Sequence, residues 1–165
     1  MKVSITRTSI LAISLAVLTA CGGDAAEGTE EAAAVAEVPA AIADRQANFE
    51  AIGDSFKAIR GQLEGDSPDL AIIEASATDI NERAQLIGDY FPAGTSVDDG
   101  FDTEALASIW EDPEGFETAH QNLATASAAL AEAAASGDAA AVGEAVKNMG
   151  GTCKACHDDF RLDTD

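Results

Sequence analysis

The chain has 165 residues, and its 30 acidic side chains against 9 basic ones give a formal net charge of −21. This length suits one domain with short appendages. A surface of such charge cannot neutralise phosphates, which excludes nucleic-acid binding; it either favours basic partners or simply keeps the protein soluble. Hydrophobic residues make up 47% of the chain but aromatic ones only 5%, because alanine is abundant. This composition indicates closely packed helices with few large side chains between them.

The first 20 residues have the pattern of an export signal. Lys2 and Arg7 precede an apolar run over residues 10–18, which is too short to span a bilayer. The run ends in Leu18-Thr19-Ala20-Cys21, which resembles the bacterial lipobox and implies cleavage before Cys21 and lipidation of its sulfur. An ordinary signal peptide followed by an incidental cysteine is the alternative.

We therefore expect a lipoprotein signal peptide over residues 1–20 and an exported protein on the periplasmic side. A lipid anchor at Cys21 would be its only attachment to the membrane. Glycine rather than aspartate follows that cysteine, which favours the outer membrane.

Residues 21–40 are mainly Gly, Ala, Glu and Thr, and Val35 and Val38 are their only larger aliphatic side chains. Such a segment cannot bury a core of its own. It is predicted to be a flexible acidic linker, with the folded domain over residues 41–165.

Four stretches of this domain show the apolar periodicity of amphipathic helices. The first is expected to begin near Ala41 and to end between Gly61 and Gly65. The second is expected to begin with Ser67 as N-cap and Pro68 at the first helical position, and to end near residue 88. The inner positions of these two helices are Ile42, Phe49, Ile52, Phe56, Ile59 and Leu63, and then Leu70, Ile73, Ala77, Ile80, Ala84 and Ile87.

A long polar loop leads to the third helix, which is expected to begin at Asp112-Pro113. Gly137 ends it, and Asp138 caps the fourth. Four helices with otherwise short connections predict an all-α, antiparallel four-helix bundle. The inner positions of the last two helices are Phe116, Ala119, Leu123, Ser127 and Leu130, and then Val142, Val146, Met149, Cys153, Cys156 and Phe160.

The fourth helix contains Cys153-Lys154-Ala155-Cys156-His157, which has the C-x-x-C-H spacing of c-type haem attachment. Two thiols three positions apart on a helix can reach both vinyl groups of one porphyrin. The next imidazole can then ligate the iron from the same side. We expect one haem c per chain, covalently bound through Cys153 and Cys156, with His157 as iron ligand. In the alternative, these residues and His120 hold structural zinc.

From Arg45 to Arg161 the chain resembles the bacterial cytochromes c′. The resemblance implies a four-helix bundle, often a homodimer through its first two helices, whose haem is five-coordinate and high-spin and binds nitric oxide and carbon monoxide. The matching residues are Arg45-Gln46 with Phe49, then Phe91-Pro92-Ala93-Gly94-Thr95, then Ile109-Trp110 with Phe116, and finally Cys153 to Arg161.

The resemblance also implies roles for single residues. Phe49 would cover the vacant face of the iron, where low-spin relatives of the c-556 type carry methionine. Arg45 and Gln46 would lie near the haem propionates, unless they are only a solvated pair at the helix edge. Arg161 would lie beside the proximal face, and Thr95, Glu104 and Trp110 along the haem edge.

The number and positions of the methionines limit the possible sixth iron ligand, independently of the family resemblance. Eight residues follow His157 and none is methionine. Once residues 1–20 are removed, Met149 is the sole methionine, and it lies two turns before His157 on the same helix, so it cannot reach the opposite haem face. His120 is expected at the flank of the third helix, partly exposed. With no distal His/Arg pair to cleave a peroxide bond, an enzyme is not expected.

The function predicted is a membrane-tethered, five-coordinate c-type cytochrome that binds diatomic gases (NO, CO), transfers electrons, or does both. The alternative is an electron-transfer cytochrome of the same fold, which serves redox partner proteins and has no physiological gas binding.

Overall fold

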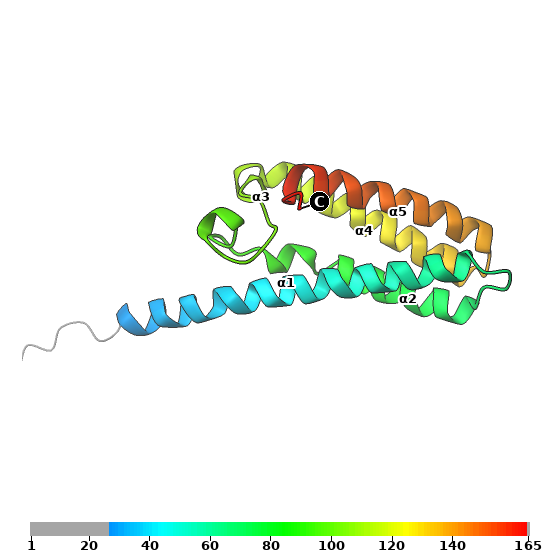
Figure 1. Ribbon diagram of the computed structural model, residues 1–165, viewed down its shortest axis with the longest axis horizontal. Helices are drawn as coiled ribbons and strands as arrows, with labels where there is room; N and C mark the ends of the chain where they lie inside the picture. The colour runs from blue at the N-terminus through cyan, green and yellow to red at the C-terminus, as the bar shows by residue number, and fades with distance from the viewer. Residues whose placement is uncertain (1–26, 165) are drawn as a thin grey trace, which may run out of the picture.

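The computed structural model of the chain describes residues 27–164, which form helices and loops without a named strand. The predicted all-α four-helix bundle is confirmed. In Figure 1, α1 and α2 form one layer, and α4 and α5 form the other. The four long helices are α1 (Glu27–Leu63), α2 (Leu70–Ala84), α4 (Pro113–Ala135) and α5 (Ala139–Phe160). The predicted signal peptide and Cys21 lie outside the described residues.

The connection between α2 and α4 holds three short elements: the 3-10 turns η1 (Ile87–Tyr90) and η2 (Val97–Asp99), and the one-turn helix α3 (Ser108–Glu111). This connection lies at one end of the bundle, beside the C-terminal end of α5 (Figure 1). An antiparallel bridge between Ala105 and Arg161 joins the two segments. Within residues 27–164, no helix combines the length and the apolar character needed to cross a membrane.

The start of α1 differs from the prediction. The helix begins at Glu27 rather than near Ala41, and it passes through Pro39. The prediction of a flexible linker is therefore wrong for residues 27–40, which extend α1 beyond the bundle (Figure 1). The physical reason is that alanine and glutamate are among the best helix formers, and adding turns to an existing helix avoids the unfavourable nucleation step.

The start of α2 was also predicted wrongly. Asp69, not Ser67, is the N-cap, and Pro68 lies before the helix. The Asp69 carboxylate accepts hydrogen bonds from the backbone N–H groups of Ala71 (3.0 Å) and Ile72 (3.3 Å). A carboxylate in this position satisfies the free donors of the first turn, so the helix begins two residues later than expected.

The ends of α4 and α5 confirm the predicted signals. The Asp112 side chain accepts from the backbone N–H of Gly115 at 3.0 Å, with Pro113 in the first turn of α4. Gly137 has φ +72°, a left-handed conformation that glycine adopts without strain. Asp138 then caps α5 by accepting from Ala140 at 2.9 Å.

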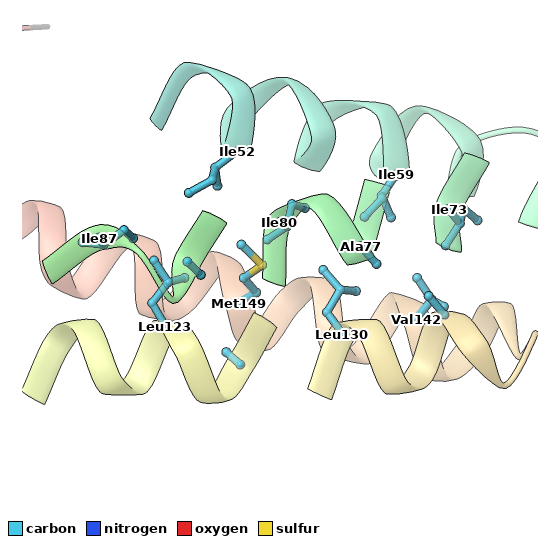
Figure 2. Packing of buried hydrophobic residues seen from close by; sticks show 13 residues of the cluster. Ile52, Ile59, Ile73, Ala77, Ile80, Ile87, Leu123, Leu130, Val142 and Met149 are labelled. Atoms are coloured by element: carbon cyan, nitrogen blue, oxygen red, sulfur yellow. The ribbon is translucent and has the colours of Figure 1, made fainter. Parts of the chain in front are cut away.

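Most of the predicted inner positions meet in one hydrophobic cluster (Figure 2), while Ala119, Cys156 and Phe160 belong to a second, smaller cluster with Ala105 and Ile109. Leu70 is the main exception, because it is 41% exposed at the start of α2. On α1 the predicted face divides: Ile52 and Ile59 are buried, whereas Phe49 and Phe56 are only half-buried. The side chains with no exposed area include Ile59, Ile73, Ile80, Leu130, Val142 and Met149.

Candidate functional site

A cavity of about 1320 Å³ lies between α1 and α5, at the end of the bundle that carries the α2–α4 connection. Pockets for small molecules typically measure about 300–1,000 Å³, so this one is large enough for a macrocycle. Its lining includes every residue predicted to contact haem except Thr95 and Trp110. These lining residues are Arg45, Gln46, Phe49, Glu104, Cys153, Cys156, His157 and Arg161.

The α5 wall of the cavity carries the two cysteines, which are half-buried free thiols. Their spacing of three residues places them on one side of the helix. Burial raises the pKa of both thiols, that of Cys156 to about 11 with further repulsion from Cys153 and Asp159. The thiols are therefore protonated at neutral pH, as S–H groups that can add across a vinyl double bond.

His157 follows on the same wall. Partial burial lowers the pKa of its imidazole and Arg161 lowers it further, while Glu104 and Asp158 act in the opposite direction. The result favours the neutral ring, which is the form that ligates iron.

Arg45 lies on the opposite wall, on α1, and only 3% of it is exposed. Its Nη1 donates to Thr95 Oγ1 (3.1 Å), and its Nη2 donates to the Thr95 carbonyl (3.0 Å) and to Thr103 Oγ1 (2.7 Å). The guanidinium carbon also lies 4.8 Å from the centroid of the Phe91 ring.

None of these partners of Arg45 is anionic. In the described part of the chain, no carboxylate forms an ion pair with Arg45. Burial lowers the pKa of the guanidinium. A buried cation without a countercharge is unfavourable, so the cavity is suited to an anionic group such as a carboxylate.

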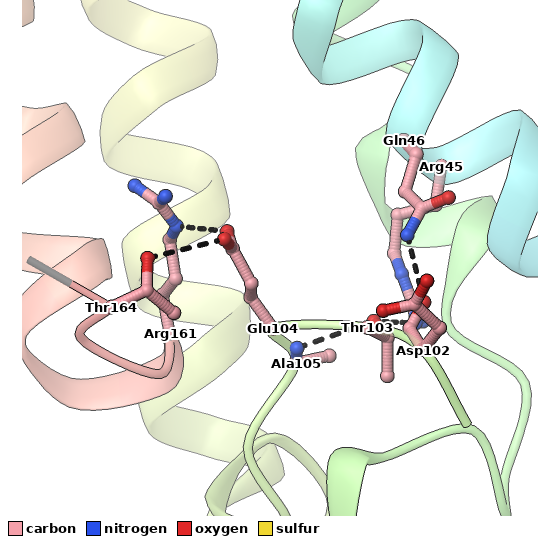
Figure 3. Close-up of polar contacts among 8 residues, drawn as sticks. All are labelled: Arg45, Gln46, Asp102, Thr103, Glu104, Ala105, Arg161 and Thr164. Atoms are coloured by element: carbon pink, nitrogen blue, oxygen red, sulfur yellow. Dashed lines mark hydrogen bonds and ion pairs between the residues drawn. The ribbon is translucent and has the colours of Figure 1, made fainter.

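Gln46 stands next to Arg45 but is exposed, and its Nε2 donates to the Asp102 carbonyl at 2.9 Å (Figure 3). Both α1 residues thus reach the loop that carries Asp102 and Thr103. Sequence reasoning missed Thr103, because a threonine in a polar loop gives no signal of a buried contact 58 positions away.

Thr95 and Trp110 do not lie where the resemblance implied. Neither is among the cavity-lining residues. Thr95 is fully buried behind Arg45 and donates to the Pro92 carbonyl at 2.8 Å. The indole N–H of Trp110 donates to the Phe91 carbonyl at 3.2 Å. These contacts hold the loop and Arg45 in place, so both residues support the cavity from behind.

Glu104 and Arg161 close one rim of the cavity. Arg161 Nε donates to Glu104 Oε2 at 2.6 Å (Figure 3). The backbone N–H of Leu162 donates to the Glu104 carbonyl at 2.7 Å. The hydrogen bond from Arg161 lowers the pKa of the Glu104 carboxyl, so this group is an anion at neutral pH. The C-terminal segment is thereby fastened to the loop.

Much of the remaining lining is apolar and aromatic, and charged side chains such as Glu50, Lys154 and Asp158 also border the cavity. The ring of Phe49 packs edge-on against Phe91, with 6.4 Å between centroids, and Phe91 packs against Phe116 at 4.7 Å. Phe116 in turn contacts Phe160 at 5.5 Å. The sequence placed Phe91 in a matching motif but gave no hint that its ring would lie between Arg45 and Phe116.

His120 is remote from this site. It is half-buried on α4, with Nε2 3.0 Å from the Ala84 carbonyl. It is not among the cavity-lining residues. Residues 27–164 contain no group of three or more His, Cys, Asp or Glu side chains that could hold a metal ion. The zinc alternative therefore has no support in the geometry.

The arrangement fits a covalently bound haem. Two half-buried thiols and an imidazole share one wall, an apolar surface faces them, and an uncompensated guanidinium lies where a propionate could pair with it.

Comparison with known proteins agrees. The family model described as Cytochrome C′ matches residues 40–161. A curated cytochrome c′ from Cereibacter sphaeroides is 37% identical over 136 residues, which cover 79% of this chain and 89% of that relative. The solved cytochrome c′ from Thermochromatium tepidum has a TM-score of 0.71 and 31% identity, covering 76% of this chain and 97% of the other. A nitric oxide complex of a cytochrome c prime variant from Alcaligenes xylosoxidans, in which one leucine is replaced by isoleucine, has a TM-score of 0.68 and 27% identity. The match covers 76% of this chain and 97% of the other.

Proposed function

The chain belongs to the cytochrome c′ family and carries one haem c through Cys153 and Cys156, and from this premise we propose that it binds nitric oxide and carbon monoxide. When bound, the haem supplies an iron centre whose face opposite His157 can take a neutral diatomic molecule. The observation that carries the proposal is the composition of the α1 wall. Between residues 45 and 56 it offers no histidine, methionine, cysteine or lysine, so it holds no strong iron ligand.

The α5 wall and the α1 wall of the cavity have different roles in gas binding. On α5, His157 provides the single protein ligand. On α1, Phe49, Ile52 and Phe56 line an apolar surface that offers water and anions no hydrogen-bond partner, so these species lose solvation on entering. Arg45 and Gln46 hold the propionate edge, because Arg45 supplies a buried positive charge. The relative from Alcaligenes xylosoxidans, solved as a nitric oxide complex, supports this assignment.

Electron transfer by the same haem is the second candidate. The strongly acidic chain, with a net charge of −21, favours encounter with basic redox proteins. A role as a peroxidase is not proposed, because His120 lies away from the cavity and no distal histidine accompanies Arg45.

The direct test is the absorption spectrum of the ferrous holoprotein with and without nitric oxide or carbon monoxide. We expect a five-coordinate, high-spin spectrum that shifts on adding either gas. Phe49→Ala is expected to bind carbon monoxide more tightly because it removes the covering ring. As the matched variant, Phe49→Met offers a thioether at the same place and should give a six-coordinate, low-spin iron. A wild-type protein that is six-coordinate in both oxidation states would contradict the proposal.

Nitric oxide sensitivity of a deletion strain separates the two roles. Increased sensitivity, rescued by the wild-type gene but not by one encoding Phe49→Met, supports gas capture. Normal sensitivity together with a respiratory defect supports electron transfer.

Export and lipid anchoring are further proposals, supported by the charged, apolar and Cys21-containing N-terminal pattern. Mass spectrometry of the protein purified from membranes tests them. We expect a mature chain that begins at a diacylated and N-acylated Cys21. A Cys21→Ser variant should be lost from the membrane fraction, and a wild-type protein cleaved at another residue would refute the anchor.

A homodimer through α1 and α2 is supported by three apolar side chains exposed on or beside α2. Leu70 is 41% exposed, Ile72 42% and Leu86 45%. Light scattering of the holoprotein should give twice the monomer mass, and Ile72→Lys should reduce it to that of a monomer. A wild-type monomer at micromolar concentration would contradict the dimer.

A further inference from the structure

His120 is a half-buried side chain on α4 that the candidate haem site does not use. Its Nε2 lies 3.0 Å from the Ala84 carbonyl. A carbonyl oxygen can only accept a hydrogen bond, so Nε2 carries the hydrogen and donates it. The other ring nitrogen, Nδ1, is buried and has no hydrogen-bond partner. The hydrogen bond that fixes the ring is therefore the one made by Nε2.

The acceptor of this bond belongs to the last residue of α2. Ala84 has no exposed area, and in the described part of the chain no backbone N–H donates to its carbonyl. The preceding carbonyl, that of Arg83, accepts from the backbone N–H of Leu86 at 3.1 Å. His120 thus completes the C-terminal cap of α2, and it does so from another helix, 36 positions along the chain.

The imidazole also lies against η1, which follows α2. A Cβ built on Gly88, within η1, would have Cε1 and Nδ1 of His120 as its nearest neighbours, at 3.4 and 3.5 Å. These are ordinary van der Waals separations, so at most a methyl group fits between the ring and the backbone of η1. The hydrogen bond and this contact together fix the place where α2 ends and η1 begins.

The nearby carboxylate of Glu117 does not account for the placement of the ring. Its Oε2 lies 3.8 Å from Nδ1 of His120, which is too long for a hydrogen bond, and its side chain is 57% exposed. Glu117 Oε1 instead accepts from Gln121 Nε2 at 2.7 Å. The contact between α4 and the end of α2 therefore depends on the hydrogen bond from Nε2 rather than on an ion pair.

The segment that follows leads directly to the cavity. The ring centroid of Phe91, a lining residue, lies 4.8 Å from the guanidinium carbon of Arg45, and the Tyr90 carbonyl accepts from Arg45 Nη1 at 3.5 Å. One turn before His120, the ring of Phe116 lies 4.7 Å from that of Phe91, measured between centroids. Residues 84–91 are thus attached to α4 at two points, one polar and one aromatic.

We propose that His120 is a positioning residue, because its cap on α2 holds residues 84–91 in place and thereby keeps Phe91 against Arg45 in the cavity wall. His120 itself is not a lining residue and acts only through this segment. The inference goes beyond the proposed function, since it concerns the wall of the cavity and applies equally to a haem that binds gases and to one that only transfers electrons.

Hydrogen exchange of the holoprotein, followed by mass spectrometry, tests the proposal. His120→Leu and His120→Phe both remove the Nε2 donor and keep an apolar side chain. We expect amides of residues 85–89 to exchange about tenfold faster in either variant, because one hydrogen bond is lost and its acceptor stays buried. Amides around Leu130 should keep the protection of the wild type. If one variant does not fold, the other decides.

The indole N–H of Trp110 shows whether the effect reaches the cavity wall. This group donates to the Phe91 carbonyl at 3.2 Å, and the chain has a single tryptophan. Ultraviolet resonance Raman spectroscopy can therefore follow its exchange without overlap from another indole. We expect faster exchange of this hydrogen in His120→Leu and His120→Phe.

Two further variants separate the hydrogen bond from other properties of the ring. In His120→Gln the side-chain amide can donate to the same carbonyl, so exchange should return to within about threefold of the wild type. Glu117→Gln is the matched control on α4, because it removes the neighbouring carboxylate and leaves the Nε2 bond intact. Its exchange should equal that of the wild type.

Four outcomes would overturn the inference. Unchanged exchange in both His120→Leu and His120→Phe would show that the aromatic contact with Phe116 holds the segment by itself. Faster exchange in all helices alike would show a merely structural role. Unchanged exchange of the Trp110 indole would show that the cap does not act on Phe91, and no recovery in His120→Gln would show that the donor is irrelevant. Absence of gas binding by the wild type would instead refute the proposed function and leave this inference standing.

Discussion

The two ends of the bundle are built differently. At the end remote from the α2–α4 connection, Ile59, Ile73, Leu130 and Val142 have no exposed area and come from all four helices. We call this part the closed end. At the opposite end, the cavity end, half-buried aromatic side chains such as Phe49 and Phe91 surround about 1320 Å³ of space between α1 and α5.

This contrast indicates that the two ends fold for different reasons. The closed end is stabilised by burial of aliphatic side chains within one chain. The cavity end holds a buried guanidinium without a countercharge and a large, partly apolar cavity, neither of which is favourable in the protein alone. Haem supplies both the missing volume and the missing negative charge, so the cavity end should depend on haem while the closed end does not.

Removing the covalent links should have the largest effect. The double variant Cys153→Ala, Cys156→Ala is expected to lose all haem on acid-acetone extraction, since no thioether remains. In hydrogen exchange, amides of residues 45–56 should lose protection far more than those around Leu130. Equal loss at both ends would show that the bundle is a single cooperative unit in which haem stabilises every helix alike.

Leu130→Ala addresses the closed end. We expect a loss of about 2–5 kcal/mol in the free energy of unfolding, because the residue is fully buried and a cavity would remain. Denaturant titration of the holoprotein measures this loss, and the haem spectrum should be unchanged. Glu132→Ala, at an exposed position two residues further along α4, is the control and should change stability by less than about 0.5 kcal/mol.

Arg45→Met should destabilise the haem-loaded protein more than the protein without haem. In the loaded protein we expect a loss of about 1–3 kcal/mol, because charge-assisted hydrogen bonds are removed. In the haem-free double variant the loss should be smaller, since removing an uncompensated buried cation offsets the lost bonds. Denaturant titration of both proteins checks the difference. Gln46→Ala, which alters an exposed neighbour, should show no such dependence on haem.

The smallest effect expected concerns the loop at the cavity end. Ser96 donates from its hydroxyl (2.6 Å) and its backbone N–H (2.9 Å) to Asp99 Oδ2, and these bonds lower the pKa of the Asp99 carboxyl. A lowered folded-state pKa stabilises the protein above the unfolded pKa of about 3.8, and this contribution is lost as the pH falls through the folded-state value. The wild type should therefore have a slightly higher thermal midpoint than Asp99→Asn at pH 6, with the gap closing below pH 4. A gap that is constant with pH would exclude this carboxyl as its source.

The elements that were well predicted have local causes. Asp112-Pro113 and Gly137-Asp138 mark their helix ends through bonds within three residues, so the sequence reveals them directly. The predicted start of α2 was wrong for a related reason. Three consecutive residues, Ser67, Pro68 and Asp69, all carry helix-start signals, and the sequence pattern does not show which of them begins the helix. The predicted start of α1 was wrong because composition alone does not distinguish a solvated coil from a continuing helix.

The candidate site also combines features with local causes and features that depend on contacts between distant segments. Cys153, Cys156 and His157 share one helix, and their relative placement follows from its period. The environment of Arg45 does not, because Thr95 and Thr103 lie 50 and 58 positions away. Such contacts depend on how the loop folds back over α1.

The sequence by itself determined the haem-attachment residues, the four apolar faces and the absence of a strong ligand on the α1 wall, since these follow from residue type and spacing along single helices. Tertiary structure alone decided the contacts of Arg45 with Thr95 and Thr103 and the supporting positions of Thr95 and Trp110. These features arise where separate segments meet. Their geometry is set by packing between elements, and no periodicity along the chain encodes it.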